Sequence, residues 1–192
     1  ICTLFRVSDF IFPSPYTITL SLAEYAKPIA QHAWQTFWTT MIGFAIAVVV
    51  GLSLGVAVGM SRFVFRGLYP LLVAFNSIPK AAVVPLLVLW FGVGTVPAVI
   101  TAFLLAFFPV AVNVALGLAT LEVELRDVLR ALGASSWQIF IKVGAPRTMP
   151  MFFASLKVAI SSAFVGSVIS ETVAANAGIG YLTEDRKAAG LF

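Results

Sequence analysis

The chain has 192 residues, of which 60% are hydrophobic and 10% are charged, and its formal net charge is +4. A mean hydropathy of +1.02 is higher than the core of a soluble domain requires, so we expect an integral helical membrane protein. The basic residues are scattered between apolar spans, which argues against nucleic-acid binding and favours the positive-inside bias of membrane proteins. The single cysteine, Cys2, excludes an internal disulfide and a cysteine-based metal site.

Four apolar spans follow one another along the chain. Each has about the 20 residues that are needed to cross a hydrocarbon core of about 30 Å. The second span is interrupted by Pro79 and Lys80, and a weakly amphipathic segment at 20–37 is a candidate for an interfacial helix before the first span. The predicted spans are 37–60, 68–90, 97–121 and 149–173.

The short loops predict the orientation of these spans. Basic residues follow the first span and lie between the third and the fourth, whereas the loop at 92–95 has none, so the basic side is cytoplasmic. Both tails then lie outside. We expect one transmembrane domain over 1–192, lacking a first and a last membrane helix, with a cytoplasmic loop at 122–149. The basic residues are Arg62, Arg66, Arg126, Arg130, Lys142 and Arg147.

The loop between the third and fourth spans predicts two short helices. Apolar residues at 125, 128, 129 and 132 form one stripe, and Gly133 stands where a helix would end in a left-handed residue. Ser135 or Ser136 would cap a second helix, which Gly144 and Pro146 would stop. Two interpretations remain: the loop docks on a partner protein, or it is a connector that packs on its own bundle.

The same loop resembles the E-A-A-x3-G-x9-I-x-L-P motif of binding-protein-dependent ABC importer permeases. Residues 127–129 stand at E-A-A, and Gly133 and Pro146 match outright. Asp127 replaces glutamate, and Val143 and Ala145 replace the isoleucine and the leucine. The likeness covers about 13–192 and is greatest to the nitrate, sulfonate and taurine branch. The further matching stretches are 77–79, 85–86, 89–94, 107–109, 132–135, 170–171 and 177–181.

The resemblance implies an all-α, polytopic bundle of the type I importer permease kind in the bacterial inner membrane. It implies docking of two ATP-hydrolysing subunits that carry ATP and Mg, a second permease copy or sister chain, and an external solute-binding protein. The solute would be a small anion such as a sulfonate, taurine or nitrate, or a heterocycle like a thiamine precursor. The predicted docking residues are Asp127, Arg130, Gly133, Ala134, Ser135, Trp137, Phe140 and Pro146.

Several residues inside the spans have a structural and a functional interpretation. Glycines at 51, 55 and 59 form a ridge for close helix packing. Lys80 would face water, a partner or the bundle interior, or reach the interface from a helix break. Lys157, Ser161 and Glu171 lie within one sector of the fourth span; they line a path, or Glu171 anchors the 174–180 loop. The candidate path residues are Asn76, Lys80, Lys157, Ser161 and Glu171.

The sequence lacks the residues of an enzyme. No G-x4-G-K-[ST] phosphate loop is present, so ATP is not expected to bind this chain. His32 is the only histidine, which argues against a zinc site, a histidine proton relay and a catalytic Ser/His/Asp set. The alternatives are a secondary transporter, which would show inverted repeats, and a membrane scaffold or channel subunit whose loop binds a partner without ATPase activity.

Overall fold

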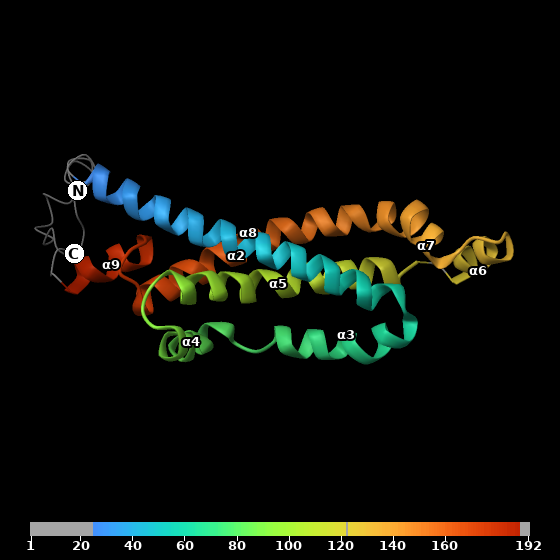
Figure 1. Ribbon diagram of the computed structural model, residues 1–192, viewed down its shortest axis with the longest axis horizontal. Helices are drawn as coiled ribbons and strands as arrows, with labels where there is room; N and C mark the ends of the chain where they lie inside the picture. Colours follow the sequence, from blue (N-terminus) through green and yellow to red (C-terminus); the bar gives the residue numbers. More distant parts are fainter. Residues whose placement is uncertain (1–24, 122, 189–192) are drawn as a thin grey trace, which may run out of the picture.

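The computed structural model describes residues 25–121 and 123–188, and these form an elongated bundle of helices (Figure 1). The described residues contain no strand, as the prediction of an all-α fold requires. α6 and α7 lie at one end of the bundle and α9 lies at the other (Figure 1). The elements are α2 (Ala26–Met60), α3 (Arg62–Asn76), η1 (Lys80–Val83), α4 (Val84–Phe91), α5 (Thr95–Ala119), α6 (Val123–Ala131), α7 (Ser136–Ile139), η2 (Phe140–Gly144), α8 (Ala145–Ala174) and α9 (Ile179–Ala188).

Three helical segments of the described chain are long and apolar enough to cross a membrane: α2, α5 and the run from Ser136 to Asp185. The pair α3 and α4 makes a fourth if it counts as one span, because its two parts are bent by 73° across a short break. The chain is therefore polytopic.

α5 is the centre of the bundle, with α2 and α8 packed against it. Its contact with α2 is close because glycines face it. A Cβ on Gly43, Gly51, Gly55 or Gly59 would lie only 2.6–3.0 Å from the Cβ of an α5 residue. The predicted packing ridge is confirmed, since these positions leave room for no side chain larger than hydrogen.

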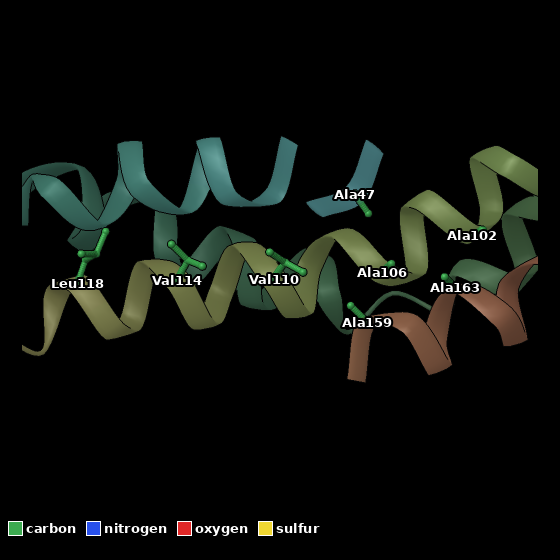
Figure 2. Close-up of a cluster of buried hydrophobic side chains, with 8 residues drawn as sticks. All are labelled: Ala47, Ala102, Ala106, Val110, Val114, Leu118, Ala159 and Ala163. Atoms are coloured by element: carbon green, nitrogen blue, oxygen red, sulfur yellow. The ribbon is translucent and has the colours of Figure 1, made fainter. Parts of the chain in front are cut away.

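Small and β-branched residues fill the interface that the three helices share (Figure 2). Short side chains let the helix backbones approach, which suits packing in lipid, where van der Waals contact must replace the hydrophobic effect. The cluster consists of Ala47, Ala102, Ala106, Val110, Val114, Leu118, Ala159 and Ala163.

α2 differs from the sequence-based prediction at its beginning. It runs for 35 residues from Ala26, so residues 26–37 continue the membrane helix, and the prediction of a separate interfacial helix is wrong for them. Residues 20–24 of that prediction lie outside the described residues. Pro28 falls in the first turn, where it removes no helical hydrogen bond, and no breaker follows it. Trp34, Phe37 and Trp38 stack on one another there with centroid distances of 5.7–5.8 Å, typical of an aromatic belt.

The fourth span also begins earlier than predicted. The helix does not stop at Gly144 and Pro146; it passes from α7 through the π-turn η2 directly into α8. Proline lacks a backbone N–H and its ring crowds the preceding turn, and a π-turn widens the backbone to make room. Thr148 donates its hydroxyl to the carbonyl of Gly144 at 2.8 Å in the first turn after η2.

The predicted interruption at Pro79-Lys80 is present between α3 and η1. A helix end at membrane depth must satisfy its last carbonyls within the protein. Ser77 donates its hydroxyl to Val73 O at 3.2 Å, and Lys80 Nζ donates to Asn76 O at 2.7 Å. A lysine at this helix C-terminus also complements the macrodipole.

Candidate functional site

The loop that was predicted to be cytoplasmic begins with α6 and turns at Gly133. Gly133 has a φ of +82°, the left-handed conformation that its position predicted. Its N–H donates to Arg130 O at 2.9 Å, and Ala134 N–H donates to Leu129 O at 3.0 Å. This pair of bonds is the Schellman arrangement, so the end of α6 is fixed by the backbone itself.

A second short helix follows at once because Ser135 caps it. Ser135 Oγ accepts from Gln138 N–H at 3.3 Å, and Gln138 Oε1 accepts from Ser135 N–H at 2.8 Å. This reciprocal capping box selects Ser135 over Ser136 as the N-cap. The change of direction between α6 and α7 is therefore specified within four residues.

α7 presents the aromatic side chain of Trp137 outward. The Trp137 ring lies 5.2 Å from that of Phe140, stacked at 28°, and Trp137 is 59% exposed. Ile139 points the other way and is buried. Leu132, beside the turn, is 78% exposed. An apolar and exposed surface at one end of the bundle is typical of a protein interface.

Positive charge gathers beside this surface. Arg62 at the start of α3 lies with Arg126, Asp127 and Arg130 of α6 around one hollow at this end of the bundle. Partial burial lowers the pKa of the Arg126 guanidinium, the charges of Arg62 and Arg130 lower it further, and Asp127 opposes them. The excess of arginine agrees with the predicted cytoplasmic face.

The predicted docking residues are thus neighbours on one end of the molecule. Among them, Ala134 and Phe140 are partly buried and the others are exposed: Asp127, Arg130, Gly133, Ser135, Trp137 and Pro146. Their role in docking stays a prediction.

The predicted path residues do not form one cluster. Asn76 and Lys80 pair at the break after α3, where Asn76 Oδ1 accepts from Lys80 Nζ at 3.1 Å. The same ammonium lies 4.7 Å from the centre of the Phe108 ring, a cation–π contact with α5.

Lys157 and Ser161 lie on an exposed face of α8, one turn apart. Ser161 borders an open groove between α2 and α8, which Phe37 and Thr40 also line. Glu171 does not share this exposure, since its side chain is only 2% exposed. The stripe predicted along the fourth span is therefore exposed at its centre and buried at its outer end.

Glu171 accepts three hydrogen bonds at the outer end of the bundle. Thr36 and Thr39 of α2 donate their hydroxyls to its carboxylate at 2.7 and 3.2 Å. Gly180 N–H donates to Oε2 at 3.3 Å, the bond that an anchor of the 174–180 loop requires. A Cβ at position 178 would collide with this carboxylate, so only glycine fits at this position of the turn. Whether Glu171 also lines a path stays a prediction.

α2 supplies residues to this network that sequence reasoning missed. Thr36 Oγ1 also accepts from Ile179 N–H at 2.8 Å, and His32 Nδ1 accepts from Gly178 N–H at 3.0 Å. The sequence did contain a sign of this network. Three threonine hydroxyls, at 36, 39 and 40, lie in an otherwise apolar helix, and hydroxyl groups in lipid need hydrogen-bond partners. The Thr40 hydroxyl is hydrogen-bonded to the Ser167 hydroxyl at 2.6 Å.

Glu171→Ala is expected to loosen the outer end of the bundle. It leaves the hydroxyls of Thr36 and Thr39 and the N–H of Gly180 without their buried acceptor, at a cost of about 2–4 kcal/mol. Glu171→Gln keeps one acceptor oxygen and should cost about half as much. Thermal unfolding of the detergent-purified protein measures both. Equal melting temperatures for Glu171→Ala and the wild type would show that this network is not structural.

Comparisons with known proteins agree with this arrangement. The family model described as binding-protein-dependent transport system inner membrane component matches residues 47–190. The chain is 33% identical over 175 residues to the formylaminopyrimidine transport permease protein ThiX of Halalkalibacterium halodurans, covering 91% of this chain and 70% of that protein. It is 34% identical over 182 residues to the riboflavin transport system permease protein RibX of Chloroflexus aurantiacus, covering 94% and 68%.

The fold is also found among solved structures. An inward-facing conformation of the MetNI methionine ABC transporter matches with a TM-score of 0.70 and 21% identity, covering 85% of this chain and 82% of that one. At that identity the match supports the type I importer permease fold alone. Together with the family model and the two permease relatives, it shows that the chain belongs to the binding-protein-dependent transport system inner membrane components and is a permease subunit of an ABC importer.

Proposed function

We propose that this permease couples ATP hydrolysis in two partner subunits to solute movement through its helices in a bacterial inner membrane. Mg and ATP would bind the partners, and this chain would contribute no catalytic residue. A second copy or a sister permease completes the path, and an external binding protein delivers the solute. The family match and its relatives' names support this assignment.

The observation that carries the proposal is the stacked pair formed by Trp137, exposed on α7, and Phe140, partly buried at the start of η2. Trp137 and Phe140 are stacked, Gly133 and the Ser135 cap fix their direction, and η2 joins them to α8 without a break. A docked subunit that moves α7 would therefore move a membrane helix. Docking is favoured over a connector that packs on its own bundle, because Trp137 makes a large apolar surface that the bundle leaves exposed.

The solute is proposed only as a class. The relatives' names refer to formylaminopyrimidine and riboflavin, both heterocycles, and other relatives are named for nitrate and taurine. A small anion or a small heterocycle fits this range. The binding protein would set most of the selectivity between them.

ATPase activity is the test of this proposal. The permease, purified in detergent from its native membrane through a tag, is expected to retain ATP-hydrolysing subunits. Trp137→Ala should lower the retained ATPase at least about tenfold, because a buried tryptophan anchor dominates an interface. Trp90→Ala on α4 is the matched control, since Trp90 is 70% exposed but lies far from the loop, and it should retain the activity.

A wild-type permease that purifies without any ATPase would overturn the proposal. The secondary transporter or the scaffold subunit would then be the better assignment. Equal retention by Trp137→Ala and the wild type would instead reject α7 as the docking element.

A further inference from the structure

We propose that Lys157 places a positive charge at the middle of a water-filled path and makes that path favour anionic solutes over cations. This inference rests on the proposed function only in that the chain forms a path. It goes further by assigning the specificity to one side chain and by separating Lys157 from the other basic residues.

The depth of Lys157 is the first argument. Lys157 is ten residues after Arg147, which marks the cytoplasmic end of α8, and therefore lies about 15 Å along the axis. That is about half the thickness of a hydrocarbon core. A lysine side chain is too short to reach either interface from this depth, so its ammonium cannot be hydrated there by snorkelling.

The lack of a partner is the second argument. In the described part of the chain, the Lys157 ammonium makes no hydrogen bond, ion pair or ring contact, and the residue is exposed. A bare lysine at the centre of a bilayer costs about 2.5–3.5 kcal/mol even on insertion scales. Its exposed face must therefore meet water or an opposite charge.

The helices α2, α3, α4, α5 and α8 of a second copy offer no free acidic side chain. Glu171 is the only acidic residue in α2, α3, α4, α5 and α8, and it is buried with three hydrogen bonds. Lys80, the other lysine at membrane depth, already has Asn76 and the Phe108 ring as partners. Of these two lysines, only Lys157 has no partner for its ammonium. Water and a passing anion would supply that partner.

The neighbouring surface suits such a path. Ser161 lies one turn from Lys157 toward the outer end and borders the open groove between α2 and α8. Its hydroxyl is bonded to the carbonyl of Lys157 at 3.2 Å, so it adds no charge of its own. No carboxylate of the described residues lines this groove, and Lys157 lies one helical turn from its edge at Ser161.

Thiol labelling tests the inference without knowledge of the solute. The only cysteine is Cys2, so Cys2→Ser gives a background free of thiols in this chain. Ser161→Cys is then added, and the assembled transporter in membrane vesicles is treated with two membrane-impermeant methanethiosulfonates, one carrying a sulfonate and one a trimethylammonium group. The ratio of the two modification rates reports the local potential.

With Lys157 present, the sulfonate reagent is expected to react faster than the cationic one. Lys157→Gln should lower the ratio about fivefold to tenfold, because a unit charge about 6 Å away acts on the two reagents in opposite directions. Lys142→Gln in η2 removes the same net charge at the cytoplasmic end and should leave the ratio unchanged. Val158→Cys, exposed on another side of α8, tests whether labelling is confined to the proposed face.

Each outcome decides the proposal. A ratio that falls with Lys157→Gln and not with Lys142→Gln supports it. No labelling at Ser161→Cys shows that no water reaches this face, and an unchanged ratio shows that Lys157 does not set the potential; either result overturns it. Labelling does not depend on ATPase activity, so a failure here is distinguishable from a permease that purifies without ATPase.

Discussion

A Gly133→Pro permease is expected to fold and to insert, yet to lose its co-purifying ATPase activity to below about a tenth of the wild-type value. Proline cannot adopt the φ of +82° that Gly133 has, because its ring fixes φ near −65°. Proline also removes the N–H that donates to Arg130 O. The end of α6 is lost, and with it the direction in which α7 presents Trp137.

The bundle should survive this change because Gly133 lies away from it. A Cβ at this position would meet no atom within 4 Å. Retained ATPase per mole of permease measures docking, and the melting temperature in detergent measures the fold. The two readouts should separate, with activity falling while the melting temperature stays within about 3 °C.

A graded series at the same position serves as the control. Gly133→Asn keeps the N–H and tolerates the left-handed conformation, so it should retain most of the activity. Gly133→Ala keeps the N–H but carries a strain of about 1–2 kcal/mol, so its retained ATPase activity should lie between those of Gly133→Asn and Gly133→Pro. Full activity in Gly133→Pro would show that the turn is not needed for docking.

The second large effect is expected at the interface of α2 and α5. Gly55→Leu should lower the melting temperature by about 10 °C or prevent insertion, because even a Cβ there lies 2.7 Å from Val114 Cβ and 2.9 Å from Ala111 O. Neither atom can move without separating the two helices that form most of the core. Gly55→Ala should cause a smaller loss in the same direction.

Gly67 on α3 provides the matched control. A Cβ at Gly67 meets nothing within 4 Å, and the residue is helical and exposed. Gly67→Leu should leave stability unchanged or raise it slightly, because leucine has the better helix propensity by up to about 1 kcal/mol. Similar losses at both glycines would mean that helix–helix distance does not explain the effect.

Features with a local cause could be predicted from the sequence. Gly133 ends α6 through its own backbone conformation, and Ser135 caps α7 through a residue three positions away. The break at Pro79 and the glycine ridge of α2 follow from residue type in the same way. Their causes lie within a few residues, so a single sequence contains them.

Features that depend on contacts between distant helices could not be predicted in full. Glu171 was placed near the outer turn, but its partners Thr36 and Thr39 are more than 130 residues away along the chain. The early start of α8 was missed for a different reason: Pro146 is a helix breaker by residue type, and only the geometry of a π-turn lets the helix pass it. In both cases the deciding information is three-dimensional.

The unbroken path from α7 to α8 has a mechanical consequence. Ser136 to Ala174 spans 39 helical residues, or about 58 Å of helix, and no loop interrupts it. A rod of that length that tilts by about 5° displaces one end relative to the other by about 5 Å. Under the proposed docking, a push on the α7 end would act on a lever arm, and the resulting tilt would change the width of the groove beside Ser161.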